Sequence, residues 1–304
     1  MPNYPQSVKI IEVGPRDGLQ NESEIISTSD KLVFIEKLIA SGLKNIEVSS
    51  FVHPEKVPQL KDAKEIISGL KEYPGLVYSA LVPNIQGLER AKESGIKRIS
   101  VFTSASETFT KKNINMTIKE SLDTFKSIAE GAKKNNISVR GYISTCFICP
   151  YEGDIAKEKV LDITKALLEL GVDEVSLGDT IGAASPKDVF ETVGHVLNKV
   201  SKENIALHFH DTYGTALANV VAGLELGIST FDSSAGGLGG CPYAPGASGN
   251  LATEDILYLL NRMNIETGVN LGKLAEASFF MQKILGRTLP SKQLKRLSVK
   301  AVHE

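Results

Sequence analysis

The sequence has few cysteines, no long hydrophobic run and no excess of either charge. Only 3 of its 304 residues are cysteine, an odd number that makes no disulfide framework and suits a reducing compartment. No uncharged apolar stretch approaches the roughly 18 residues that a membrane span needs. The first six residues lack the basic and apolar regions of a signal peptide and the Arg-rich pattern of a transit peptide. We therefore expect a cytoplasmic protein with no membrane segment.

The charge balance argues against a nucleic-acid partner. Lys and Arg number 34 against 36 Asp and Glu, which gives a formal net charge of −2, and no basic stripe stands out. An anionic ligand must therefore be held by a few placed groups. Hydrophobic residues make up 42% of the chain and charged residues 23%, a balance typical of a globular protein with a large core.

A weak internal repeat predicts the architecture. Gly42, Gly95, Gly171 and Gly227 each follow a helix-like stretch and precede a β-like one, as C-cap glycines do. They are 53, 76 and 56 residues apart, room for two βα units of about 25–35 residues in each gap. We expect eight strands, at residues 8–13, 45–48, 77–82, 98–101, 139–144, 174–177, 205–209 and 230–232. Eight alternating βα units favour an α/β fold of the closed (β/α)8 (TIM) barrel type over a doubly wound open sheet.

We expect one catalytic domain over residues 1–304, with the barrel at about 5–265 and a C-terminal helical extension at about 266–304. One helix, near residues 118–134, opens with Thr117 and Glu120 in capping-box spacing. The extension ends in a basic tail around Lys292–Lys300 that we expect to be frayed. The extension should pack on the barrel or on a second copy of the chain, which favours a homodimer.

Polar residues follow several of the expected strands, where the active sites of such barrels lie. His208 and His210 stand at i and i+2 of a strand, so both imidazoles face one side and can meet one ion. A lone histidine would more often be a core residue, but this pair has Asp17 at a neighbouring strand end. Two imidazoles with a carboxylate and an amide or water oxygen form a mixed site that suits Mg, Mn or Zn. Asn250 either gives the amide oxygen or caps the next helix at Glu254.

Arg16 lies in a Pro-Arg-Asp-Gly turn after the first strand. Its guanidinium is either part of a surface ion pair or a fixed fork for a carboxylate or a developing enolate oxygen. Glu47 and Asp179 are either interior carboxylates of the barrel or simple caps. Residues 104–115 either contact an anionic substrate tail or form a solvated loop.

A loop at residues 236–249 holds six glycines in fourteen residues. It lacks the spacing and the Gly-Lys-Ser/Thr ending of phosphate-binding loops. A mobile lid that presents Cys241 for acid–base or nucleophilic chemistry is the favoured interpretation, and a long connector with an incidental cysteine is the alternative. Cys146 and Cys149 have CxxC spacing but no second pair, which favours a structural role.

Four motifs together resemble the 3-hydroxy-3-methylglutaryl-CoA lyases of bacterial type. They are GPRDGLQN at 14–21, LGDTIG at 177–182, HFHDT at 208–212 and GGLGGCPYA at 236–244. The resemblance covers nearly the whole chain, to about residue 290. The Arg-Asp-Gly turn and the His-x-His pair are shared with a wider superfamily of metal-dependent aldolases and Claisen-type synthases, whereas the Cys241 loop is specific to the lyases.

The resemblance implies cleavage of a CoA thioester, 3-hydroxy-3-methylglutaryl-CoA, to acetyl-CoA and acetoacetate, aided by a divalent cation, Mg or Mn. By position, Asp17, His208, His210 and Asn250 resemble the metal ligands, and Arg16 resembles the substrate-binding and catalytic arginine. Glu47 and Asp179 resemble acidic residues that support the site, and Cys241 resembles the catalytic loop cysteine. His208 or Asp179 could move the hydroxyl proton. Alternatives are a Claisen-type acyl-CoA synthase, a pyruvate-class aldolase, or a catalytically silent barrel that acts as a scaffold.

Overall fold

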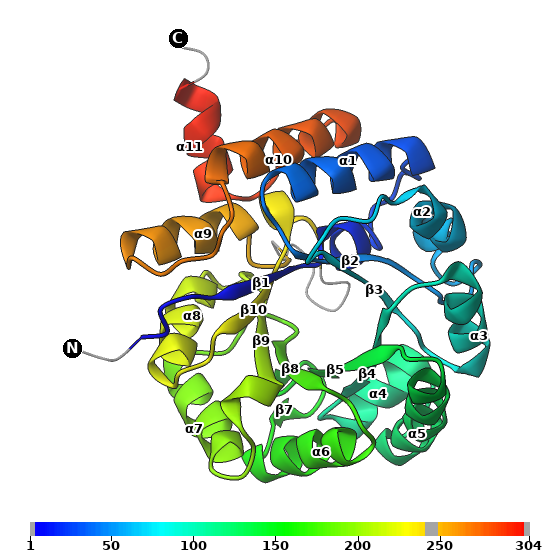
Figure 1. Ribbon diagram of the computed structural model, residues 1–304. Helices are drawn as coiled ribbons and strands as arrows, with labels where there is room; N and C mark the ends of the chain where they lie inside the picture. The colour runs from blue at the N-terminus through cyan, green and yellow to red at the C-terminus, as the bar shows by residue number, and fades with distance from the viewer. Residues whose placement is uncertain (1–3, 241–248, 301–304) are drawn as a thin grey trace.

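The structure is a computed structural model that describes residues 4–240 and 249–300. Eight parallel strands close into a barrel with helices on its outside (Figure 1), which confirms the predicted fold. The order around the barrel is β1-β10-β9-β8-β5-β4-β3-β2. The strands are β1 (Lys9–Glu12), β2 (Asn45–Ser50), β3 (Val77–Leu81), β4 (Arg98–Ser104), β5 (Ser138–Ser144), β8 (Glu174–Asp179), β9 (Ile205–Phe209) and β10 (Thr230–Ser233). The two remaining strands, β6 (Ile148–Cys149) and β7 (Gly153–Asp154), form a small antiparallel hairpin after β5.

Each barrel strand is followed by a helix, as the repeat predicts. The outer helices are α1 (Thr28–Ala40), α2 (Ala63–Gly69), α3 (Ile85–Ser94), α4 (Glu107–Ile114), α5 (Ile118–Lys134), α6 (Lys157–Glu169), α7 (Pro186–Leu197), α8 (Ala216–Glu225) and α9 (Thr253–Arg262). Gly95 caps α3 in the left-handed conformation, and α5 opens with the predicted capping box of Thr117 and Glu120. Of the two alternatives for residues 104–115, the solvated loop is excluded over Glu107–Ile114, because Ser106 accepts the amide of Phe109 and starts α4 there.

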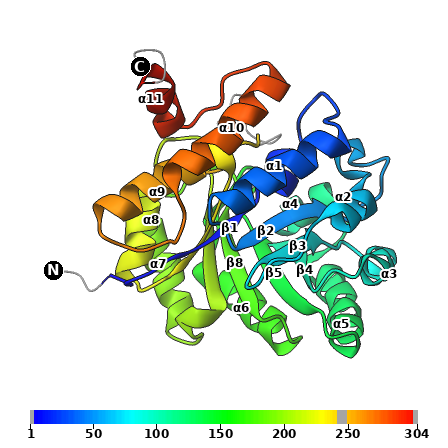
Figure 2. The same cartoon turned by 45° about the horizontal axis from the view of Figure 1, so that its top comes forward.

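The C-terminal extension packs on the barrel through α10 (Leu271–Leu285), which lies beside α1 in both ribbon views (Figures 1 and 2). Its buried face includes Leu274, Ala277 and Met281. The division of the chain at about residue 265 stays a prediction.

The basic tail is a helix rather than a frayed segment over the residues that the structure describes. This helix is α11 (Lys292–Lys300). Asp255 on α9 accepts the amides of Gln293 at 2.8 Å and Lys292 at 3.1 Å and the hydroxyl of Ser291 at 2.8 Å. A nearly buried carboxylate thus satisfies donors that the first turn of a helix otherwise leaves unpaired.

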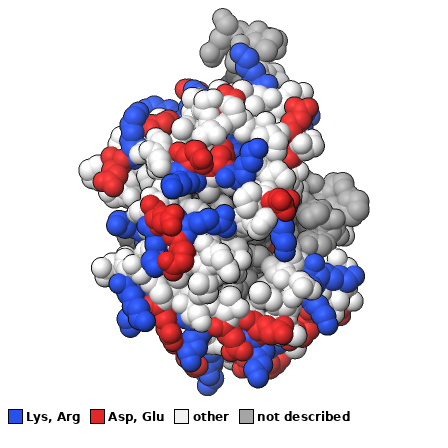
Figure 3. Space-filling model, turned by 90° about the vertical axis from the view of Figure 1, so that its right-hand side faces the viewer, with Lys and Arg blue, Asp and Glu red and all other residues white. Residues whose placement is uncertain are grey.

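The outer surface gives no sign of a polyanion-binding face on the side that Figure 3 shows, because its acidic and basic side chains are interspersed. None of the helices within the described ranges is both long and apolar enough to cross a membrane.

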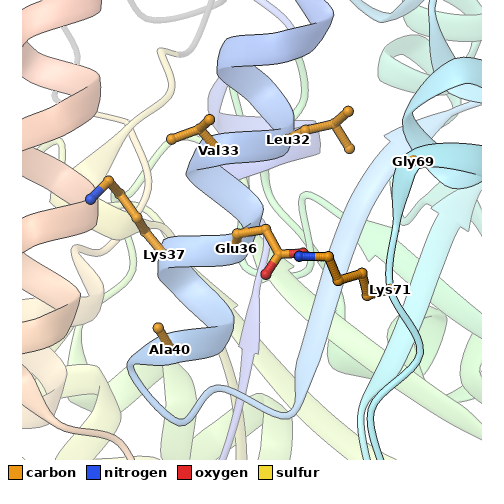
Figure 4. A pocket seen from close by; sticks show the side chains of 7 residues that line it. All are labelled: Leu32, Val33, Glu36, Lys37, Ala40, Gly69 and Lys71. Carbon is orange, nitrogen blue, oxygen red and sulfur yellow. The ribbon is translucent and has the colours of Figure 1, made fainter.

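A shallow groove of about 450 Å³ lies between α1 and the end of α2 (Figure 4). Glu36 and Lys71 form an exposed ion pair across it, with Oε1 and Nζ 3.5 Å apart, and pairs of this kind contribute little. Its lining is otherwise mainly aliphatic, so it brings together no catalytic groups. The lining residues are Leu32, Val33, Glu36, Lys37, Ala40, Gly69 and Lys71.

A buried carboxylate joins three segments at the end of the barrel where the strands finish. Glu12 is fully buried, and its Oε1 accepts the amides of Gly14 and Ala235, each at 2.8 Å. Its Oε2 contacts the hydroxyl of Thr253 at 2.7 Å. Burial raises the pKa of Glu12 to about 8, although these hydrogen bonds oppose the rise. Near neutral pH the Glu12 carboxyl is therefore mainly protonated. Its hydrogen bonds connect the loop after β1, the loop after β10 and α9.

Replacing Glu12 by glutamine should make stability less dependent on pH. The unfolded carboxyl ionises near its ordinary pKa of 4.5 while the folded one keeps its proton to about pH 8. The free energy of unfolding of the wild type therefore falls as pH rises through this window, by at most about 5 kcal/mol. In urea unfolding at about pH 5, 7 and 9, the free energy of unfolding of the variant should rise relative to that of the wild type as pH rises. Parallel pH profiles would contradict the assignment, and Glu72→Gln at an exposed position is the control.

Candidate metal centre and active site

Asp17, His208 and His210 converge at the end of the barrel where the strands finish. One ligand atom from each lies within 4.8 Å of the others. The two imidazole ring centroids are 5.2 Å apart. His208 is in β9 (Ile205–Phe209), and His210 is the first residue after this strand. Because side chains two residues apart on a strand point to the same side, both rings face the same way.

Asp17 is held in place by three neighbours. It lies in one turn of π-helix, η1 (Gly14–Gly18), rather than in the simple turn expected. Its Oδ1 accepts Arg16 Nη1 at 2.5 Å and Gln20 Nε2 at 3.1 Å, and its Oδ2 accepts Asn250 Nδ2 at 2.9 Å. Burial alone would raise the pKa of Asp17, but Arg16, with smaller contributions from the two histidines, lowers it below its ordinary value. The side chain of Asp17 is therefore an anionic carboxylate that could bind a cation.

Asn250 and His210 leave buried ligand atoms without a hydrogen-bond partner. The amide nitrogen of Asn250 bonds Asp17 and the carbonyl of Leu238, so its Oδ1 remains buried and unpaired. The helix after it is instead preceded by Ala252, so the capping alternative is excluded. His210 has a buried, unpaired Nδ1, and burial lowers the pKa of this residue to about 3, which keeps the imidazole neutral.

These donors fit a divalent cation. One carboxylate, two imidazoles and an amide oxygen form the mixed oxygen and nitrogen set that suits Mg or Mn, and neutral imidazole is the form that binds a metal. Asp17, His208, His210 and Asn250 could hold such an ion together.

Arg16 is nearly buried beside the metal site, which excludes the surface ion pair. Its Nε donates to Glu47 Oε2 at 2.5 Å, and its guanidinium carbon lies 5.4 Å from the centroid of the Tyr142 ring. Ser100 donates to the other oxygen of Glu47. Burial by itself would lower the pKa of Arg16, but Glu47 and Asp17 raise it above its ordinary value. Among the described residues, Nη2 of Arg16 has no partner, so this donor is available to a ligand oxygen.

Asp179 ends β8 and has both a structural contact and a perturbed pKa. Its two oxygens accept the amides of Ala183 at 3.1 Å and Ala184 at 3.0 Å, which fixes the loop before α7. Burial raises the pKa of Asp179 to about 6, against these hydrogen bonds. A carboxyl group with this pKa can both take up and release a proton near neutral pH.

A charged network that the sequence alone does not predict fills the barrel behind the candidate metal site. Arg140 of β5 binds Asp232 of β10 through two nitrogens, at 2.7 and 3.2 Å, and Glu174 of β8 through Nε at 2.8 Å. Glu174 also accepts Lys9 Nζ at 2.6 Å. The available signal was the presence of charged residues inside strands that the barrel must bury.

Cys241 lies outside the described residues, but the glycines around it are informative. Gly239 and Gly249 have φ angles of 122° and 77°. A Cβ at Gly249 would lie 2.3 Å from the carbonyl oxygen of Gly239, and one at Gly239 would lie 2.6 Å from Asn250 Nδ2. Side chains are thus excluded here, and the chain leaves and returns beside the metal site.

A pocket of about 300 Å³ adjoins the same site. It lies between the loops after β9 and β10 and the start of α11. The lining residues are Asp211, Thr212, Gly214, Gly237, Asn250, Ala252, Asp255, Pro290, Ser291 and Lys292. Because Asn250 is among them, a ligand in this pocket could reach the metal site.

The CxxC pair lies apart from this chemistry. Cys146 Sγ donates to the carbonyl of Ile143 at 3.0 Å, and Cys149 Sγ donates to Ser106 Oγ at 3.1 Å. Both thiols are buried, and burial raises the pKa of Cys146. A structural role fits these contacts.

Comparisons with known proteins agree on one family. A model of the HMGL-like family matches residues 7–281. A hydroxymethylglutaryl-CoA lyase of Bacillus subtilis is 52% identical over 291 residues, which cover 96% of this chain and 97% of that protein. The crystal structure of hydroxymethylglutaryl-CoA lyase from Pseudomonas aeruginosa has a TM-score of 0.96 at 47% identity and covers 98% of this chain and 99% of its own.

A third relative has been solved with ligands. It is an HMG-CoA lyase from Acinetobacter baumannii in complex with coenzyme A and 3-methylmalate, with a TM-score of 0.92 at 38% identity over 97% of this chain and 96% of its own. The matched family model and these full-length relatives show that the chain belongs to the HMGL-like family, with the hydroxymethylglutaryl-CoA lyases as its relatives.

Proposed function

We propose that this chain is a hydroxymethylglutaryl-CoA lyase, which cleaves 3-hydroxy-3-methylglutaryl-CoA to acetyl-CoA and acetoacetate with Mg or Mn as the cofactor. The observation that carries the proposal is the meeting of three ligand atoms within 4.8 Å beside the free donor of Arg16. Family membership and full-length lyase relatives support it.

The reaction needs a base, an anion-stabilising group and an acid. The tertiary hydroxyl of the substrate loses its proton, and its oxygen forms the ketone of acetoacetate. The bond between the hydroxyl-bearing carbon and the carbon next to the thioester then breaks. The electron pair of that bond passes to the thioester side, which becomes the enolate of acetyl-CoA. A divalent cation at the site would lower the pKa of the hydroxyl. His208 or Asp179 accepts the hydroxyl proton, and the pKa of Asp179 near 6 suits that task.

Arg16 then stabilises the enolate oxygen through its free nitrogen, while Glu47 and Asp17 hold the guanidinium rigid. Because Glu47 contacts Arg16, it acts by orienting the guanidinium.

Cys241 is the proposed acid that protonates the enolate carbon and gives acetyl-CoA.

The CoA thioester would enter beside Asn250, where the 300 Å³ pocket adjoins the metal site. The ligands of the Acinetobacter relative, coenzyme A and 3-methylmalate, support this substrate class. The Pseudomonas relative is named for 3-hydroxy-3-isohexenylglutaryl-CoA as well as hydroxymethylglutaryl-CoA. The methyl substrate is our proposal, and the isohexenyl thioester is the comparison in an assay. A homodimer and a cytoplasmic location remain predictions, which light scattering and fractionation would test.

Acetoacetate release from 3-hydroxy-3-methylglutaryl-CoA should require Mg or Mn and disappear on chelation. Cys241→Ala should lower kcat by about 10²–10⁴-fold, the usual contribution of a general acid, with Mn affinity unchanged. Cys149→Ala, at a structural thiol, is the matched control.

Each alternative predicts a different result in this assay. A synthase would consume acetyl-CoA and a 2-oxo acid with little lyase turnover, and an aldolase would cleave a pyruvate-type substrate. A silent scaffold would give no turnover with either metal present.

A further inference from the structure

We propose that Asp232 is a positioning residue that fixes the tautomer and ring orientation of His208. The inference rests on the proposed role of His208 as a metal ligand, and it adds a residue that acts through His208 without touching substrate.

The two residues are neighbours on adjacent strands. Asp232 of β10 is the register partner of His208 of β9. Asp232 Oδ2 lies 3.3 Å from Nδ1 of His208. That nitrogen is buried and has no other hydrogen-bond partner, and the contact is slightly long for a finished hydrogen bond. A small rotation of the ring would complete it.

Asp232 itself is held firmly. Its side chain is fully buried, Arg140 binds both of its oxygens, and Ser176 Oγ donates to the oxygen that faces His208 at 2.7 Å. The two guanidinium contacts prevent the carboxylate from turning away, and Arg140 and Ser176 together donate to both of its oxygens. The carboxylate therefore acts as an acceptor, and His208 can complete the contact only by donating a proton from Nδ1.

The consequence is that Nε2 of His208 carries the lone pair and no proton. With the proton on Nδ1, the lone pair of Nε2 is the one available to bind an ion or to take a proton. His210 has no such carboxylate partner among the described residues, and its Nδ1 is unpaired. Only one of the two histidines is thus oriented by a carboxylate, and this asymmetry distinguishes His208 as the ring with a fixed reactive nitrogen.

Imidazole ¹⁵N NMR of the metal-free protein at about pH 8, where an ordinary histidine is neutral, tests the proposal directly. We expect His208, assigned by comparison with His208→Gln, to carry its proton on Nδ1 in the wild type. A wild-type Nε2–H tautomer would overturn the proposal whatever the variants do.

Asp232→Asn supplies the second test. Its amide nitrogen can donate toward Nδ1, so the variant should shift His208 to the Nε2–H tautomer. Mn affinity, measured by electron paramagnetic resonance without substrate, should fall about 10–100-fold, and kcat should fall more than KM changes. Ser176→Ala removes a hydrogen bond from the same oxygen and should keep the wild-type tautomer and affinity. Equal losses in both variants would mean that the network is only structural.

The two proposals can fail separately. The expected tautomers without lyase turnover would reject the proposed function and keep the role of Asp232. Normal turnover with an unchanged tautomer in Asp232→Asn would reject the role of Asp232 and keep the function.

Discussion

Replacing Arg16 by glutamine is expected to lower kcat by about 10²–10³-fold, the usual effect of removing a donor that stabilises an oxyanion, while Mn binding survives. The reason is that two nitrogens of Arg16 are bound to Glu47 and Asp17, while its third nitrogen has no partner within the described ranges and can meet a ligand. Lysine carries its three donors on one nitrogen and lacks the planar fork that reaches Glu47, Asp17 and a ligand at once, so Arg16→Lys should restore little. Turnover with the CoA thioester and Mn affinity without it are the measurements.

The control must separate catalysis from folding. Among the described residues, removing Arg16 leaves the buried Glu47 carboxylate with Ser100 as its one side-chain partner, and breaking a buried ion pair in this way costs about 3–5 kcal/mol. In the double variant Arg16→Gln with Glu47→Gln, the unpaired charge is gone. Recovery of the unfolding temperature without recovery of turnover supports the catalytic role, whereas recovery of both would assign Arg16 a structural role.

Asp17→Asn is expected to abolish metal-dependent turnover by weakening Mn binding at least about 100-fold, more than the loss of an outer contact causes. Asp17 is the only carboxylate in the group of three converging ligand atoms within the described ranges. Calorimetric titration of the metal-free protein with Mn measures this loss of affinity.

Gln20→Ala is the matched comparison for Asp17→Asn. It removes a 3.1 Å contact to the same carboxylate but keeps the charge. Its Mn affinity should stay within a few-fold of the wild type. Wild-type affinity in Asp17→Asn would place the cation elsewhere.

The barrel and the convergence of Asp17, His208 and His210 were predictable because their signals are local. Gly95 ends a helix by its conformation alone, and the i, i+2 spacing of His208 and His210 follows from strand geometry. Placing Asp17 beside them needed only the rule that the ends of barrel strands meet at one rim.

What could not be predicted depends on partners that are distant in the sequence. Arg140 and Asp232 are 92 residues apart, and which inward side chains meet depends on the stagger of the closed barrel. The last helix was expected to be frayed because its cap, Asp255, lies 36 residues before Ser291. The sequence leaves two roles open for Asn250, because the contact that orients its amide is with Asp17, 233 residues away.

The charged network behind the metal site constrains how this barrel can evolve. Asp232 and Glu174 provide two negative charges, and Arg140, Lys9 and Arg98 provide three positive ones; the side chains of Asp232, Glu174 and Arg140 are nearly inaccessible. Neutralising Arg140 leaves Asp232 without its cationic partner and takes one from Glu174, at a cost of about 3–5 kcal/mol in comparable buried pairs, whereas exchanging a whole buried pair for apolar residues is often tolerated. Substitutions here should therefore be epistatic, with viable routes passing through coordinated pairs. New specificity would arise more readily in the rim loops, where residues can change one at a time.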